Sequence, residues 1–252
     1  MIGQTYGDSE PVFFNDNKTY NTNTLSLKGA YLISSLWQFG LEASFLSKDN
    51  TYNSTAESNS SLADTSLSLT FELFPEEYFS VWKPRVFIFV RQLFPTGKSN
   101  YESDSELLSD VSGKGHYITS SGLILSKVYR SIDWQLFFEY KYLYKTKVNQ
   151  MEIAGHTGFT TGGSLGLSPA GTNFRLGVGI TNFYFDSKEI LIKNQKQASS
   201  EEQYWDSSFT VNYLHKDSTY SLTYTDQTLL GPSQNTTLSR TISLSWLERW
   251  PL

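Results

Sequence analysis

Hydrophobic and polar residues alternate along most of this chain, in runs of about ten residues that polar segments separate. In the run 37–46, for example, Trp37 and Phe39 fall on one face and Gln38 and Glu42 on the other. Seven further runs alternate as clearly: residues 24–33, 65–74, 132–144, 174–182, 204–213, 219–225 and 238–246. Alternation of this length is typical of β-strands whose two faces meet different surroundings.

Four weaker runs complete the set of predicted strands. Residues 85–94 are apolar on both faces, and glycines interrupt residues 117–128 and 157–167, which indicates bends or bulges. A closed antiparallel barrel with both chain ends on one side needs an even number of strands. The faint pattern at residues 10–16 is therefore expected to be the first of about twelve strands.

The segments between these runs alternate in length. Short links fall near residues 34–36, 75–84, 129–131, 168–173 and 215–218, and long polar links fall near 47–60, 95–116, 145–157, 186–203 and 226–236. Short periplasmic turns and long outer loops are typical of outer-membrane β-barrels. The sequence therefore predicts an all-β fold, in which residues 1–252 form a single transmembrane, antiparallel up-and-down β-barrel domain.

Composition helps to decide between a membrane barrel and a soluble β-sandwich, in which the apolar faces would turn inward. Aromatic residues make up 15% of the chain, against 18% for charged residues. The polar faces carry mainly Ser, Thr, Gly and Asn, whereas a face in bulk water would carry more Lys and Glu. We therefore expect the rings to face lipid. Crossing by helices is excluded, because no run approaches the roughly 20 apolar residues of a spanning helix.

Large aromatic residues fall at the predicted strand ends. Trp37, Trp134 and Trp246 mark the periplasmic side, and Trp205 and Tyr144 mark the outer side. Two such belts at the level of the lipid headgroups are typical of membrane barrels. The expected location is the bacterial outer membrane. No secretory signal is visible at the start of the sequence, so we expect a mature chain whose signal peptide has been removed.

Charge and cysteine content narrow the possible partners. The net charge of −5 argues against nucleic acid, because phosphates require a basic surface. The absence of cysteine removes disulfides, thiolate metal sites and cysteine nucleophiles. The expected partners are outer-membrane lipid, a small organic solute and, at the long outer loops, a protein.

The alternation also places a set of charged residues toward the lumen. Glu72 and Arg85 flank one periplasmic turn on neighbouring strands, where they can pair. Arg91 is expected at about mid-height, beside the strand that holds Glu72 and near the strand that holds Glu42. The lumen and constriction candidates are Lys28, Glu42, Glu72, Arg85, Phe87, Phe89, Arg91, Glu139, Lys141 and Arg175. Facing lipid near the midplane, each arginine would cost about 2–4 kcal/mol. The set forms either a constriction that selects solutes by charge or a plug of paired charges in a narrow barrel.

No constellation of residues indicates an enzyme. His116, His156 and His215 lie in predicted loops and turns without a Ser or acidic partner at a recognisable spacing, so we expect solvated side chains. The GxGxxG, P-loop and GxSxG motifs are absent. We predict no catalytic site, no metal and no cofactor, and a membrane-embedded hydrolase is the least favoured alternative.

Three segments resemble the outer-membrane, transporter-like family associated with the meta-pathway of phenol degradation. They are LFPTGKS (Leu93 to Ser99), SGKGHYITSSGLILSK (Ser112 to Lys127) and the strand SIDWQLFFEYKYLY that follows. The resemblance implies a barrel that passes small, often hydrophobic organic compounds across the outer membrane. The family has no established catalytic residues to transfer to this chain.

Two functions from different classes follow. The first is an outer-membrane channel or facilitator for passive passage of small organic solutes, including hydrophobic or aromatic ones. The alternative is a closed barrel that acts as a membrane anchor or docking platform and binds a protein partner through long outer loops such as residues 95–116.

Overall fold

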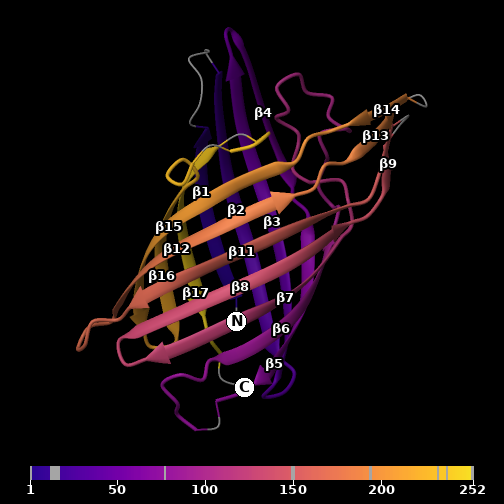
Figure 1. Ribbon diagram of the computed structural model, residues 1–252. Helices are drawn as coiled ribbons and strands as arrows, with labels where there is room; N and C mark the ends of the chain where they lie inside the picture. The colour runs from indigo at the N-terminus through magenta and orange to yellow at the C-terminus, as the bar shows by residue number, and fades with distance from the viewer. Residues whose placement is uncertain are drawn as a thin grey trace.

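The computed structural model contains only strands, turns and irregular segments among the residues that it describes (Figure 1). These are residues 2–11, 18–76, 78–148, 151–192, 195–231, 233–236 and 238–250, with side chains described from residue 19 onward. Within these ranges, no helix has the length and apolar character needed to cross a membrane.

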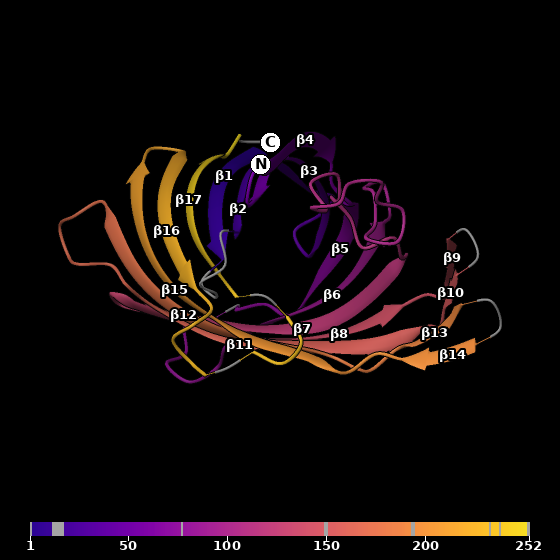
Figure 2. The ribbon, with the colours of Figure 1, turned by 90° about the horizontal axis from the view of Figure 1, so that it is seen from above.

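Twelve strands among the described residues form one closed wall (Figure 2). They are β1 (Ile2–Pro11), β2 (Lys18–Leu32), β3 (Trp37–Tyr52), β5 (Thr65–Phe74), β6 (Arg85–Phe94), β7 (Ile118–Tyr129), β8 (Ile132–Leu143), β11 (His156–Leu167), β12 (Phe174–Phe185), β15 (Glu202–His215), β16 (Ser218–Asp226) and β17 (Ser239–Glu248). Each strand pairs antiparallel with the next along the chain, and β17 pairs with β1, which closes the ring. The predicted up-and-down β-barrel is confirmed.

Most predicted runs coincide with strands of the wall. Residues 65–74 and 85–94 are β5 and β6, and the other regular runs differ from their strands only at the ends. The first strand differs more. β1 begins at Ile2. The sequence did not reveal this start, because Ile2, Gln4 and Tyr6 alternate only weakly with glycines and small polar residues. Most of the predicted run at 10–16 lies outside the described residues.

Several of the predicted long loops contain strands beyond the wall. β3 continues to Tyr52 and turns into β4, and two further hairpins form a separate sheet in the order β14-β13-β10-β9. Their bounds are β4 (Thr55–Leu62), β9 (Thr146–Val148), β10 (Met151–Ile153), β13 (Glu189–Ile192) and β14 (Gln195–Ala198). The sequence signal was missing because most of these hairpins are rich in polar residues and lack the apolar alternation that marks a strand in lipid.

The outer surface of the wall is an apolar band. Along β3, exposed residues alternate with half-buried ones, so that Trp37 and Phe39 point outward and Gln38 and Glu42 point inward. Large apolar side chains are also exposed on the strands from β5 to β17 that form the wall: Leu69, Val90, Leu123, Leu136, Leu165, Val178, Phe209, Leu222 and Leu244. A closed barrel with such a surface is stable only where hydrocarbon covers it. The barrel therefore spans a membrane, with small polar residues on its inner face.

Inward-facing rings lie over glycines of the neighbouring strands. A Cβ atom built at Gly122 would lie 2.5 Å from the Phe89 ring, and one at Gly162 would lie 2.6 Å from the Phe137 ring. The pairing of β7 and β11 with their neighbours runs without a shift in register. The prediction of bulges in these strands was therefore wrong, and these two glycines make room for rings.

The segment between β5 and β6 covers a lysine on the outer face of the barrel. Lys127 lies directly opposite the outward-facing Trp134, yet its side chain is almost completely buried. Its ammonium group pairs with Glu76 and lies 5.0 Å from the centre of the Phe79 ring. An uncovered ammonium would be costly at a lipid-facing position. This periplasmic segment therefore shields the Lys127 ammonium from lipid.

Candidate functional site: the lumen and its outer mouth

Ion pairs connect neighbouring strands on the inner face of the barrel. Arg85 of β6 donates two hydrogen bonds to Glu72 of β5, at 2.6 and 2.8 Å, so these two residues do form a pair. Lys28 of β2 lies directly opposite Glu42 of β3, and their charged atoms are 2.8 Å apart. Both pairs follow from strand register, because directly opposite or diagonal residues on one face lie within side-chain reach.

Arg91 pairs with a carboxylate on the other side of its strand from Glu72 and Glu42. Its guanidinium lies 3.5 Å from Glu139 on β8, two strands away, and forms no ion pair with Glu72 or Glu42 among the described residues. The intervening strand β7 places Ser120 directly opposite Arg91. Its small side chain leaves room for the guanidinium to reach across.

Glu139 joins two cations on the inner wall. Lys141 lies two residues further along β8, with its ammonium 3.4 Å from the second carboxylate oxygen of Glu139. The same ammonium lies 5.5 Å from the centre of the Phe183 ring on β12. Charge and aromatic surface therefore lie side by side in this part of the lumen.

Arg175 has a partner that the sequence analysis did not select. It donates hydrogen bonds to both oxygens of Asp133 on β8, across the intervening strand β11. Gly166 of β11 lies between the two, and a Cβ atom there would collide with both side chains. Asp133 lies on the polar face of its run in the sequence, but the pair depends on a glycine of the intervening strand β11, which alternation alone does not reveal.

The cations of two of these pairs reach water, and their carboxylates do not. The side chain of Arg85 is 47% exposed and that of Glu72 is 8% exposed. The corresponding values are 42% for Arg91 and 7% for Glu139. The inner wall therefore presents positive charge to solvent at these points.

Phe87 and Phe89 lie on the same inner face as the arginines of β6. The guanidinium of Arg85 lies 5.1 Å from the centre of the Phe87 ring, and that of Arg91 lies 5.7 Å from the Phe89 ring. These are cation–π distances. β6 therefore contributes an apolar stripe beside its charges, although a role for these residues in a constriction stays a prediction.

The aromatic residues proposed as belts lie at the two ends of the wall. Trp37 and Trp134 belong to the short-turn end, as does Trp246, and Trp205 and Tyr144 belong to the opposite end. Trp37 also packs against Phe71 with the ring centres 4.6 Å apart. Contact of these rings with lipid headgroups stays a prediction.

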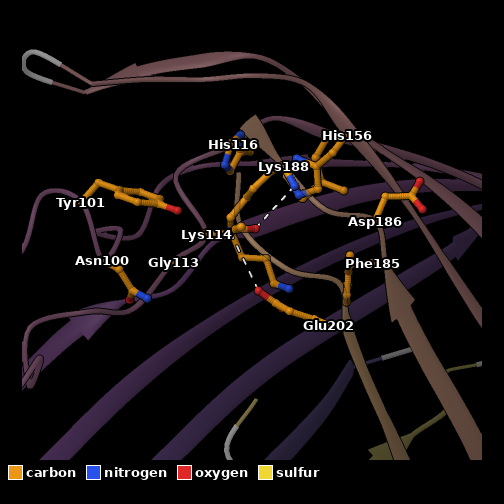
Figure 3. Close-up of a pocket in the computed structure, with 12 residues that line it drawn as sticks. Asn100, Tyr101, Gly113, Lys114, His116, His156, Phe185, Asp186, Lys188 and Glu202 are labelled. Carbon is orange, nitrogen blue, oxygen red and sulfur yellow. Dashed lines mark hydrogen bonds and ion pairs between the residues drawn. The ribbon is translucent and has the colours of Figure 1, made fainter. Parts of the chain in front are cut away.

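A cavity of about 240 Å³ opens at the outer mouth, between the wall and the segment that joins β6 to β7 (Figure 3). The wall contributes Leu143 and Phe185, and Glu202 lies at the start of β15. Lys188 follows β12 and forms an ion pair with Glu202 at 3.9 Å. Lys114 belongs to the segment above, so the cavity combines cations with apolar surface.

Two histidines line the same cavity, and the expectation that they are solvated loop residues was wrong. His116 and His156 are buried, and their rings meet edge to face with centres 5.5 Å apart. The His116 Nδ1 atom lies 2.7 Å from the carbonyl oxygen of Tyr144. Burial lowers the pKa of His116, so its ring is neutral at pH 7. Among the described residues, no group of three His, Asp or Glu could hold a metal ion.

Asp64 fixes the position of Lys114. It lies between β4 and β5, and its carboxylate accepts hydrogen bonds from the backbone amides of Gly97, at 3.0 Å, and Lys114, at 2.7 Å. The segment is also held to the β3–β4 hairpin, because Asn50 donates a hydrogen bond of 2.8 Å to the carbonyl of Leu107. The strand hairpin that the sequence did not predict therefore supports one side of the cavity.

Asp110 links the two halves of the segment between β6 and β7, and it makes the folded conformation of this segment sensitive to acid. Burial would raise the pKa of Asp110, but Lys98, the Ser103 hydroxyl and the Asp104 amide lower it to about 2. Since the pKa in the folded state is below the unfolded value of about 3.9, the ionised carboxylate stabilises the segment above about pH 4. This stabilisation is lost as the pH falls toward 2.

We therefore expect amide hydrogen exchange in residues 98–113, corrected for intrinsic rates, to accelerate between pH 4 and pH 2. The Asp110→Asn variant should exchange faster at neutral pH and lose this acid-dependent step. Unchanged protection of the segment at pH 2 in the wild-type protein would contradict the assignment.

Sequence reasoning missed most of the cavity. Lys114, Lys188 and Glu202 lie in or next to segments that it treated as polar loops, where alternation carries no information about orientation. The one available signal was the Gly113–Gly115 run, since glycines around a lysine indicate a tight backbone path. These three residues lie together only because the β6–β7 and β12–β15 connections fold toward each other at the outer end of the barrel.

Comparison with known proteins gives similarity in fold. No family model matches the sequence, and no curated protein matches it in sequence. An outer membrane channel from Pseudomonas putida F1 has a TM-score of 0.69 and 12% identity, over 98% of this chain and 94% of that chain. The NanC porin has a TM-score of 0.57 and 12% identity, over 99% and 100%. The transport unit of the autotransporter AIDA-I from Escherichia coli has a TM-score of 0.57 and 9% identity, over 99% and 89%. At these identities the likeness concerns architecture, and the chain has the fold of a bacterial outer-membrane β-barrel.

Proposed function

We propose that the protein is a passive channel for small organic solutes across the bacterial outer membrane. The observation that carries the proposal is the exposure of Arg85 and Arg91, which lie on the inner face of a closed barrel and yet have nearly half of their side chains in contact with solvent. Water that reaches both side chains inside the wall is what a conducting lumen requires.

The class of solute follows from the inner surface. Phe87, Phe89 and Phe183 lie beside cations along the lumen. Such a wall suits small organic molecules with apolar or aromatic parts. The resemblance of three segments to the family of the phenol meta-pathway supports the same class, and the fold shared with the Pseudomonas putida channel is compatible with it.

The docking-platform alternative explains less of the molecule. The β9–β14 sheet and the β3–β4 hairpin form an ordered surface beyond the wall, but a barrel that serves only as an anchor gains nothing from charged residues exposed to water in its interior. Stoichiometric capture of a protein partner by a barrel without conductance would favour that alternative.

The test combines conductance with labelling of single introduced cysteines, since the native chain has none. Thr210 and Val211 are adjacent on β15, with Thr210 facing inward, where it bonds Thr223, and Val211 facing outward opposite Leu222. In planar bilayers we expect single-channel steps, and a charged, water-soluble thiol reagent should lower the conductance of the Thr210→Cys variant.

The same reagent should leave the Val211→Cys variant unchanged, because lipid covers that position. A correctly folded barrel without conductance would overturn the proposed function. Equal labelling of both positions would overturn the assignment of inner and outer faces.

A further inference from the structure

We propose that the cavity at the outer mouth binds a small organic carboxylate that carries a ring. The proposal rests on the channel function for its role in transport, and it goes further by naming the site and the charge of the solute. The cavity lies where a solute entering from outside first meets the wall, between the β6–β7 segment and the ends of β8, β12 and β15.

Two lysines, Lys114 and Lys188, line this cavity, and a third, Lys141, lies close to its Phe185 wall. The ammonium of Lys114 lies 4.5 Å from the centre of the Phe185 ring, and that of Lys141 lies 5.6 Å from the same ring. Lys188 lines the cavity from the segment after β12, as Figure 3 shows together with Lys114 and Glu202. The positive charges of Lys114, Lys141 and Lys188 repel one another. An anion bound among them would reduce this repulsion.

Two carboxylates, Asp186 and Glu202, line the same cavity, but neither forms an ion pair with Lys114 among the described residues. Glu202 is 3.9 Å from Lys188, and Glu139, which pairs with Lys141, is shared with Arg91. Lys114 forms no ion pair with any residue in the described part of the chain. A bound carboxylate would supply the missing partner.

The titration behaviour of Lys114 agrees with this geometry. Although the side chain reaches water, the protein atoms around it lower its pKa. The charges of Lys141 and Lys188 lower the pKa further, and those of Glu202 and Asp64 oppose these effects without cancelling them. An anion in the cavity would oppose both effects, because a negative charge close to an ammonium favours its charged form.

The remaining surface explains why the anion should carry a ring. Leu143, Phe185 and Tyr101 give the cavity apolar walls beside the cations. Its volume of about 240 Å³ is below the roughly 300–1,000 Å³ of sites for drug-sized ligands. A single ring with one carboxylate therefore fits the chemistry and the size better than an oligosaccharide. The exposed arginines on the wall below continue the positive surface inward.

The experiment measures binding separately from conductance. Fluorine NMR of 4-fluorobenzoate with the detergent-purified barrel should show saturable binding, and the neutral analogue 4-fluorobenzamide should bind at least about tenfold more weakly. Trifluoroacetate, an anion without a ring, should also bind more weakly than 4-fluorobenzoate. Equal binding of the amide would overturn the proposal, and equal binding of trifluoroacetate would remove the ring from it.

Variants locate the binding. Lys114→Gln should weaken 4-fluorobenzoate binding about tenfold, and Lys114→Arg should largely preserve it. The matched control is Lys147→Gln, because Lys147 pairs with Glu152 on the β9–β10 hairpin outside the cavity. Heat-modifiable migration on SDS gels reports folding of each variant, and Lys188→Gln replaces Lys114→Gln if the latter does not fold. Unchanged binding in a folded Lys114→Gln or Lys188→Gln variant would overturn the site.

The two proposals fail in different ways. Conductance without 4-fluorobenzoate binding would leave the channel and remove this site. Binding that depends on Lys114, in a barrel without conductance, would leave the site and remove its role in transport.

Discussion

Replacing Val178 by arginine is expected to lower the free energy of unfolding by about 2–4 kcal/mol. Val178 lies in the middle of the apolar stretch of β12, between Leu176 and Ile180, and all three side chains are exposed on the outer face. A guanidinium there would have to lie in hydrocarbon or deform the bilayer around it. Denaturant titration of the barrel folded into phospholipid vesicles, followed by tryptophan fluorescence, measures the change.

The matched control is the same substitution on the inner face at the same height. Ser208 lies directly opposite Gly179, the neighbour of Val178 along β12, and points into the lumen. Because water fills the lumen and Gly179 has no side chain to block it, Ser208→Arg should change stability by about 0.5 kcal/mol or less. Equal effects at the two positions would show that the faces of β12 and β15 are assigned wrongly.

Valine in place of Gly122 is expected to destabilise the barrel by about 3 kcal/mol, the upper part of the usual range for overpacking. A Cβ atom at this position would lie 2.4 Å from the backbone oxygen of Phe138 and 2.5 Å from the Phe89 ring. The ring can move, but the oxygen belongs to the strand ladder and can move only if the ladder does. The same denaturant titration measures this loss, and reduced heat-modifiable folding should accompany it.

Two further variants separate the causes of this effect. Ser126→Val places the same side chain on the inner face of β7 without a ring lying over a glycine, and it should have little effect. Adding Phe89→Ala to Gly122→Val should remove the part of the destabilisation that the clash with the ring causes. The part that the clash with the backbone oxygen causes should remain. A Gly122→Val barrel as stable as the wild type would mean that the ring does not lie over this glycine.

The wall of the barrel was predictable because lipid and water impose opposite demands on its two faces. In β5 this contrast sets every residue to one side, so the predicted range 65–74 agrees with the strand. β6 is apolar on both faces, and Arg85 and Arg91 are the residues that mark its inner side. A shift of one residue would turn Arg85 and Arg91 toward hydrocarbon, at a cost of about 2–4 kcal/mol for each arginine near the midplane. The hairpins beyond the membrane meet water on both sides, so no such contrast marks β4, β9, β10, β13 and β14.

The candidate site was predictable only in part, for a related reason. The pair of Glu72 and Arg85 depends on neighbouring strands and a known face, both of which the pattern provides. The contact of Arg91 with Glu139 depends on a serine in between, and the contact of Arg175 with Asp133 depends on a glycine in between. The cavity depends on Asp64, a residue between strands that positions Lys114 through its backbone amide. Contacts that depend on a third residue lie beyond what the alternation of a single sequence can reveal.

The rings that cover glycines have a consequence for the life of the chain before it reaches the membrane. Because Phe87 and Phe89 face inward and their neighbours face lipid, β6 contains five consecutive apolar residues, Val86 to Val90. An unfolded chain in transit exposes this stretch, and uncharged β-prone segments of such length self-associate. Arg85 and Arg91 flank it on both sides. The charges that pair with carboxylates in the finished barrel thus serve earlier as gatekeepers against aggregation.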